Sequence, residues 1–209
     1  MRYLYIDTSS SYLYTAIVEN GKLLSEIKEE FGQSLSEVAL PKIASMFEKT
    51  NLEAKDIDKI IVVDGPGSFT GIRIGITIAK VYAWSLDIPI TTITSLEAMA
   101  LSSDKETAHV PMINARRGYV YTAIYDKDYN ELLKPQHMKL EDLLKELEKI
   151  NEYEFISNDK FEGIENIKEY NPNLEKVVNY FKDKDSVNPH AVNPEYLKLT
   201  AAEESKLWL

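Results

Sequence analysis

The sequence predicts an α/β protein of mixed β-sheets flanked by helices, built as one large domain or two smaller lobes. Residues 59–86 read as a buried strand, a glycine-rich turn and a long helix. The chain also opens with three strands before its first helix, and strands are again followed by a helix in its second half. Its 209 residues suffice to bury a substantial core. We expect an N-terminal lobe over residues 1–102 and a C-terminal lobe over residues 103–209.

Composition narrows the function classes. The net charge of −10 argues against unaided non-specific binding to nucleic acid, which depends on Lys and Arg neutralising phosphates. The chain has no cysteine, which excludes disulfides, a thiolate nucleophile and Cys-ligated zinc. The first expected strand leaves no room for a signal peptide, and no uncharged apolar run reaches about 18 residues. We therefore expect a cytoplasmic protein with no membrane contact.

The opening strands are expected over residues 2–6, 12–19 and 22–29. Asn20-Gly21 lies between the second and third, and this dipeptide is typical of a two-residue hairpin turn. Three strands ahead of the first helix do not match a dinucleotide-binding fold, which begins strand, helix, strand.

The first helix is predicted to start after Ser34, which forms a capping-box pattern with Glu37. Its apolar face includes Phe47, and Leu40 and Ala44 widen that face to a second flank. A widened face suggests two neighbours, the protein's own sheet and a second surface. Burial of the whole helix within one domain is the alternative.

The helix after the glycine-rich turn is predicted over residues 69–86, and the hydroxyl of Ser68 can cap it. Gly71, Gly75, Ala79 and Ala83 recur every four residues and form a ridge with almost no side chain. Such a ridge allows another backbone to come close, either in a subunit contact or around a phosphate at the helix N-terminus. Tight packing onto the protein's own sheet explains the same spacing.

The second half continues with strands over residues 88–94, 108–114, 119–125 and 154–157. Helices are expected over residues 95–101, 140–150 and 173–181. The charged residues between 159 and 188 indicate a solvated face.

Motifs for catalysis are missing. No two histidines are spaced three or four residues apart, so we expect neither a structural nor a catalytic transition metal. The glycine-rich turn lacks the lysine of a P-loop, and Ser68 is out of register for a nucleophile elbow. We expect no catalytic residue.

A nucleotide phosphate or magnesium could meet the end of the first strand, at Asp7, Thr8 and Ser9. Gly67 and Ser68 at the start of the helix could hold an anion through backbone N–H groups. A strand-ending turn capped by its own side chains is the alternative for Asp7.

Several segments together resemble one family. GPGSFTGIRIG at residues 65–75 is similar to the signature of the TsaB family, also called YeaZ. Further matches are YIDTSS at residues 5–10, QSLSEVALPKI at 33–43, SLEAMA at 95–100, NARRGYVY at 114–121, and PEYLKLTAAE near the C-terminus. The resemblance covers most of residues 1–125 and then the end segment.

The resemblance implies an actin/Hsp70/sugar-kinase-like (ASKHA) fold of two related lobes. It implies a scaffold subunit, not itself an enzyme, in the synthesis of threonylcarbamoyladenosine next to the anticodon of tRNAs that read ANN codons. The expected partners are a TsaD-like transferase, which this chain would bind and activate, and a TsaE-like ATPase. The chain would be a homodimer when alone and would meet tRNA only through the complex.

The resemblance also implies that two N-terminal-lobe helices form the pairing surface. The expected contact residues are Leu40, Ala44, Phe47, Gly71, Ile72, Gly75, Ala79 and Ala83. No nucleotide is expected to bind this chain firmly, and ATP or ADP at the subunit boundary is left open.

Three residues depart from the family pattern: Gln33 replaces a common His, Asn114 a common Asp and Tyr119 a common Glu. The rival function is a stand-alone nucleotide-binding enzyme or peptidase of the same fold. The kinase form of that rival needs ATP at Asp7 and the turn, and the peptidase form lacks a visible metal or Ser–His pair.

Overall fold

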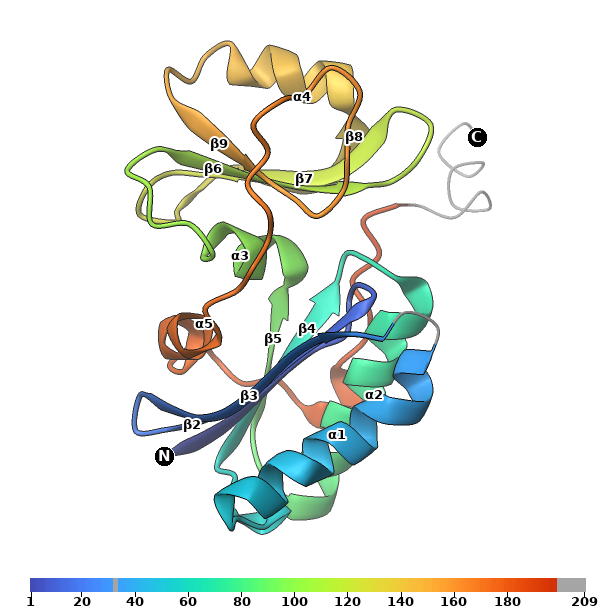
Figure 1. The fold of residues 1–209 in the computed structure, drawn as a ribbon, viewed down its shortest axis with the longest axis vertical. Coiled ribbons are helices and arrows are strands. Elements are labelled where there is room, and N and C mark those ends of the chain that lie inside the picture. Colours follow the sequence, from blue (N-terminus) through green and yellow to red (C-terminus); the bar gives the residue numbers. More distant parts are fainter. Residues whose placement is uncertain (32–33, 199–209) are drawn as a thin grey trace. The chain divides into compact units, whose positions relative to one another are not determined.

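The structure, a computed structural model, describes residues 1–31 and 34–198, and it divides them into two compact units. Unit 1 contains Met1–Ala98 and Pro172–Glu195, and unit 2 contains Met99–Asn171 and the described residues that follow Glu195. Figure 1 shows a sheet with flanking helices in each unit. The predicted fold class, mixed sheets flanked by helices, is confirmed.

Unit 1 is built on a five-stranded sheet in the order β3-β2-β1-β4-β5. Its strands are β1 (Arg2–Asp7), β2 (Tyr12–Glu19), β3 (Lys22–Glu30), β4 (Lys59–Gly65) and β5 (Ile90–Thr94). β1, β2 and β3 are successive antiparallel strands, whereas β4 is parallel to both β1 and β5. Asn20 and Gly21 both have positive φ, so the predicted tight hairpin turn between β2 and β3 is confirmed.

Helices cover both faces of this sheet. α1 (Leu35–Thr50) and α2 (Phe69–Leu86) share one apolar core with alternate residues of the strands, among them Leu4, Ile6 and Ile60. α5 (Leu174–Phe181) packs against β1, β2 and β3. A 3-10 turn, η2 (Ala54–Asp56), follows α1, and another, η3 (Pro189–Ala191), contacts α2.

Unit 2 is built on a four-stranded sheet in the order β8-β7-β6-β9. Its strands are β6 (Ala108–Asn114), β7 (Tyr119–Tyr125), β8 (Glu131–Lys139) and β9 (Tyr153–Ile156). α4 (Leu140–Leu147) inserts Leu143 and Leu147 into a core with Val110 and Val120. α3 (Ser95–Ala100) contains the boundary between the two units.

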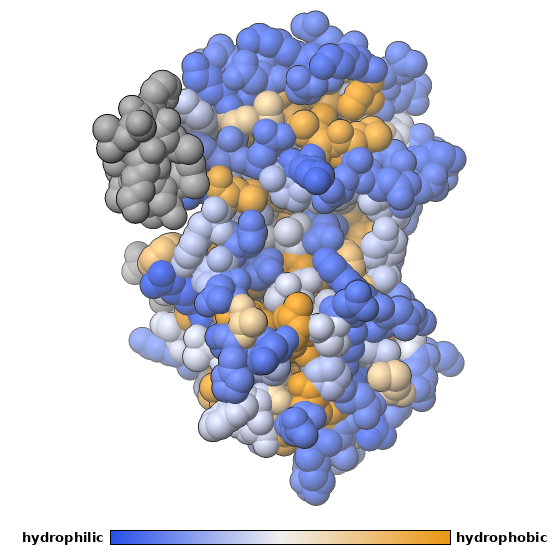
Figure 2. Space-filling view, turned by 180° about the vertical axis from the view of Figure 1, so that it is seen from behind, coloured by the Kyte–Doolittle hydropathy of each residue, from blue (hydrophilic) through white to orange (hydrophobic). Residues whose placement is uncertain are grey.

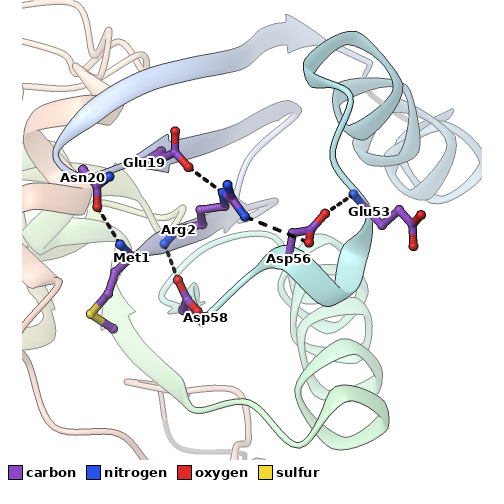
Figure 3. Close-up of polar contacts among 7 residues, drawn as sticks. All are labelled: Met1, Arg2, Glu19, Asn20, Glu53, Asp56 and Asp58. Carbon is purple, nitrogen blue, oxygen red and sulfur yellow. Dashed lines mark hydrogen bonds and ion pairs between the residues drawn. The ribbon is translucent and has the colours of Figure 1, made fainter.

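The start of the chain is fixed by side chains along one end of the first sheet (Figure 3). The Arg2 N–H donates to Asp58 and the Arg2 guanidinium to Glu19, both at 2.6 Å. The N-terminal ammonium donates to the side chain of Asn20 in the β2–β3 turn. These contacts tie the start of β1 to the end of β2 and to the residue before β4.

Three features differ from the expectation. Ser34 has helical backbone angles and makes no side-chain cap, because its hydroxyl donates to the carbonyl of Phe31 instead, so the predicted capping box is wrong. β8 was not predicted. The boundary also lies after Ala98 instead of residue 102, and Pro172–Glu195 returns to unit 1, where Val192 joins the first core.

Candidate functional site

The glycine-rich turn after β4 has the local structure that the sequence predicts. Gly65, with φ +132°, ends the strand, and the Gly65–Pro66 peptide bond is cis. Ser68 then has an extended backbone, and its hydroxyl accepts the N–H of Gly71 at 3.2 Å, so the predicted N-cap of α2 is confirmed. The turn also contacts the end of β1, because the Ser68 N–H donates to the carbonyl of Ser9 at 2.6 Å.

The ridge of small residues on α2 faces the protein's own first strand. A Cβ atom on Gly71 would overlap the carbonyl oxygen of Thr8, and one on Gly75 would overlap the Thr8 hydroxyl. Ala79 and Ala83 are fully buried in the core of unit 1. The interpretation of this ridge as the surface that meets another subunit is therefore corrected: Thr8, directly after β1, meets Gly71 and Gly75, and the core of unit 1 covers Ala79 and Ala83.

Two further residues of the expected contact set are also buried. Ile72 and Phe47 belong to the core of unit 1, and the Phe47 ring stacks on Tyr82 between α1 and α2. Leu40 and Ala44 are exposed on α1. Of the eight expected contact residues, only these two are accessible in the isolated chain.

The polar end of β1 is engaged in its own turn. Asp7 is buried, and its Oδ1 accepts the N–H of Ser9 at 2.8 Å. Burial raises the pKa of Asp7, and hydrogen bonds from Ser9 and Tyr5 oppose that effect. The Thr8 hydroxyl donates to the carbonyl of Gly71 at 2.7 Å. These contacts follow the alternative of a self-capped turn, and nucleotide binding at Asp7, Thr8 and Ser9 stays a prediction.

A cavity of about 420 Å³ opens beside this turn. Hydroxyl side chains from the β1–β2 turn and from the first turns of α1 and α2 converge on it. Its lining residues are Ser10, Ser11, Leu35, Ser36, Ser68, Thr70, Gly71 and Ile74. Ser68 is the one expected phosphate-binding residue among them, since Asp7, Thr8, Ser9 and Gly67 do not line it.

Sequence reasoning missed most of this lining. No binding role is predicted for Ser10, Ser11, Leu35, Ser36, Thr70 or Ile74. The signal that could have found them is the run of small polar residues after β1, together with two helices that begin with Ser and Thr in their first turns. Periodicity alone does not show that the two helix starts lie together.

Several apolar side chains on α1 and α2 are exposed. Leu40 is 49% exposed on α1, and Val81 is 54% and Trp84 67% exposed on α2. Ile74 and Ile78 are half-buried on the flank of α2 and pack against the core of unit 1. Figure 2, which views the molecule from behind, shows that apolar side chains reach the surface in separate patches among hydrophilic ones.

Asp64 is a half-buried carboxylate at the end of β4. Burial raises its pKa to about 7, nearby Glu195 and Glu97 add to the effect, and a hydrogen bond with Thr92 opposes it. The Asp64 Oδ1 is buried and has no hydrogen-bond partner among the described residues. The backbone carbonyl of Asp64 accepts the N–H of Glu195 at 2.8 Å, which fixes the returning C-terminal segment to β4.

Within residues 1–31 and 34–198, no three His, Asp or Glu side chains are grouped so that they could hold a metal ion. No helix in the same part of the chain is long and apolar enough to cross a membrane.

The fold and the site together define a class. The chain is a two-unit α/β protein in which a glycine-rich turn sets a buried small-residue helix against the first strand and leaves an adjoining helix pair partly exposed. The fold is that of YeaZ from Pseudomonas aeruginosa: two solved structures match with TM-scores of 0.73 and 0.70 at 18% and 19% identity, each covering 94% of this chain and 99% of theirs. One of them is described as similar to peptidase YeaZ.

Sequence comparison identifies the family. A family model described as TsaD, tRNA N6-adenosine threonylcarbamoyltransferase, matches residues 27–203. The tRNA threonylcarbamoyladenosine biosynthesis protein TsaB of Bacillus subtilis is 33% identical over 97% of this chain and 96% of its own length. The TsaB protein of Escherichia coli is 32% identical over 62% of this chain and 57% of its own. The chain belongs to the TsaB family.

Proposed function

We propose that this protein is a scaffold subunit in the biosynthesis of threonylcarbamoyladenosine in tRNA. In this role it binds and activates a TsaD-like transferase, which modifies the adenosine next to the anticodon of tRNAs that read ANN codons. The carrying observation is the match to the B. subtilis TsaB protein along nearly the full length of both chains.

The surface proposed for pairing is the outer side of the α1–α2 pair. Leu40 and Ala44 on α1 are exposed, and so is Val81 on α2. Exposed apolar side chains on adjacent helices favour a helical partner surface, because their burial removes apolar area from water. We propose that the same surface forms a homodimer in the isolated chain and a heterodimer with the transferase.

We propose a non-catalytic role because the polar side chains at the end of β1 are hydrogen-bonded within unit 1. Asp7 and Thr8 bond to Ser9 and Gly71 within unit 1, which leaves them poorly disposed to receive a phosphate or magnesium. We propose that the chain has no catalytic activity of its own and no firmly bound nucleotide, and that ATP or ADP binds at the subunit boundary. A TsaE-like ATPase completes the assembly, tRNA is met through the complex, and the location is cytoplasmic.

Reconstitution tests this function. An unmodified tRNA transcript is incubated with the TsaD-like and TsaE-like partners, with and without this chain, and threonylcarbamoyladenosine is measured by mass spectrometry. We expect modification only when this chain is present. Full modification in its absence would contradict the proposed role.

The rival function is that of an enzyme acting alone. A peptidase is one form of it, because one of the similar solved structures is described as similar to peptidase YeaZ. Calorimetry with magnesium-ATP and hydrolysis of a peptide mixture by the isolated chain address the two forms. Tight binding of ATP or turnover of peptides would favour the rival.

A further inference from the structure

The hairpin between β6 and β7 has an unusual backbone at its tip. Arg116 and Arg117 have φ of +67° and +54°, and Gly118 follows at +77°. Two successive arginines in the left-handed region are disfavoured, since each Cβ lies close to a backbone carbonyl there. Residues held in such a conformation are concentrated at functional sites.

Hydrogen bonds hold this tip in place. The Asn114 side chain accepts the N–H of Arg116 at 2.8 Å, and the Asn114 N–H donates to Asp159 at 2.7 Å. The Leu140 N–H donates to the carbonyl of Gly118 at 2.8 Å, which ties the tip to the start of α4. The two arginines are therefore presented from a fixed backbone.

The charges at the tip are unmatched. Arg116 and Arg117 are both exposed, and neither guanidinium has an ion-pair partner within the part of the chain that the structure describes. Many other cations do have one: Lys42, Lys105 and Lys127, for example, each pair with a glutamate. In a chain of net charge −10, two adjacent unpaired arginines form a local cationic site.

Aromatic rings adjoin the tip. Tyr119, the first residue of β7, stacks on His137 of β8 with ring centroids 4.8 Å apart, and Tyr121 lies on the same ring at 5.3 Å. All three side chains are half-buried, so part of each stays accessible within unit 2. Lys139 lies opposite Tyr119 in the strand pairing, but its ammonium group is paired with Glu141 at 3.3 Å, so the unpaired charge here is that of the two arginines.

We propose that Arg116, Arg117 and Tyr119 form a contact surface for single-stranded RNA. The guanidinium groups bind backbone phosphates, which they match in charge and hydrogen-bond geometry, and the tyrosine ring stacks on a base. The combination of cations with a preformed aromatic group favours RNA over an acidic protein, which would need the cations alone. The choice of tRNA as that RNA rests on the proposed function.

The test uses the chain assembled with its TsaD-like partner and an unmodified tRNA transcript that reads an ANN codon. The variant Arg116→Asn/Arg117→Asn removes both charges, and asparagine tolerates the left-handed backbone, so the fold is retained. We expect at least tenfold weaker tRNA binding at about 0.1 M salt. We also expect the slope of log K against log salt to fall in magnitude by about 1.4, since each phosphate on a single strand contributes about 0.7.

Two further variants sharpen this test. Lys22→Asn/Lys134→Asn removes two exposed charges away from the tip and should leave tRNA affinity near that of the unaltered chain. Tyr119→Leu keeps an apolar side chain against His137 but removes the ring, and should weaken binding without changing the salt slope.

Unchanged affinity and slope in the arginine variant would overturn the proposal. So would a loss of subunit assembly with unchanged tRNA affinity per assembled complex, since the arginines would then contact a protein. Assembly and tRNA modification by the unaltered chain are measured in parallel. If the unaltered chain neither assembles with its partner nor supports tRNA modification, the proposed function is contradicted. The proposal about the arginines is judged separately, from the tRNA affinity of the variants.

Discussion

The hydroxyl of Thr8 donates a 2.7 Å hydrogen bond to the backbone carbonyl of Gly71, across 63 residues of sequence. The contact joins the end of β1 to the first turn of α2, and both groups are buried. The carbonyl of Thr8 lies where a side chain of Gly71 would be. This close approach explains why a glycine stands at position 71, in the first turn of α2.

Replacing Thr8 with valine should destabilise unit 1 by about 1 kcal/mol, the usual net value of a buried neutral hydrogen bond. Valine keeps the branched shape and removes only the donor. Urea denaturation followed by circular dichroism measures the change. Thr8→Ser retains the hydroxyl and is the control, and equal stability of the valine variant and the unaltered chain would show that the bond contributes nothing.

Gly71→Ala should lower the free energy of unfolding by more than Thr8→Val does. Helix propensity alone predicts a gain of about 1 kcal/mol for this change. Overlap of the new Cβ with the Thr8 carbonyl should reverse the sign and give a net loss of roughly 1–3 kcal/mol, because backbone cannot move aside cheaply. Thr77→Ala, at an exposed position of the same helix, should raise the free energy of unfolding by up to about 0.7 kcal/mol, the propensity difference alone. A stabilised Gly71→Ala variant would contradict the close approach.

Leu40→Glu should weaken pairing without weakening the fold. Leu40 is 49% exposed, so a charge there is solvated in the free chain and is buried only when another subunit covers α1. Light scattering of the isolated chain and co-purification with the TsaD-like partner measure pairing, and a thermal melt measures the fold. Leu132→Glu, at an exposed position of unit 2, is the matched control. Pairing that survives Leu40→Glu would place the contact elsewhere.

Asp64→Asn should raise stability at neutral pH and leave it little changed below about pH 4. The carboxyl has a pKa of about 7 in the folded chain and close to the ordinary aspartate value of 3.8 when unfolded. Between these values the folded state binds more protons than the unfolded state, so the free energy of unfolding falls as pH rises and the loss is complete above about pH 7. The asparagine variant lacks this loss.

Urea midpoints of both chains across this pH range provide the measurement. The advantage of the variant should grow from about pH 4 to about pH 7, to the order of a few kcal/mol at most. Asp128→Asn, at an exposed position, is the control. A constant difference between the chains at all pH values would show that Asp64 does not titrate in this window.

Much of the fold was accessible from the sequence because its elements carry strong local signals. The strands over residues 108–114 and 119–125 and the helix over residues 69–86 were predicted with the bounds that the structure shows. β8 was missed, because Lys134, Pro135 and Gln136 interrupt its apolar pattern and because its pairing with β7 stabilises it. The return of Pro172–Glu195 to unit 1 depends on contacts far apart in sequence, which no local pattern reports.

The site was less accessible for a related reason. A four-residue spacing of small side chains indicates that another part of the backbone comes close to the helix, but it does not identify that part. In the structure it is Thr8, directly after β1. The cavity likewise combines Ser10, Ser36 and Thr70 from three separate segments, and only the folded sheet brings them together. The sequence indicates the accessibility of Leu40 and Ala44, because the apolar face of their helix is wider than contact with a single sheet requires.

The discontinuous path of unit 1 has a consequence for synthesis. A chain leaves the ribosome N-terminus first, and the first core gains Val192 only after all of Met99–Asn171 has been made. The ammonium group of Lys80 donates to the carbonyls of His190 and Val192 at 3.2 and 2.8 Å, so these hydrogen bonds also form only after that segment has been made. The nascent chain can therefore complete the sheet of unit 2 while the α1–α2 pair still lacks its last packing segment, so unit 1 is completed only after Pro172–Glu195 has been made.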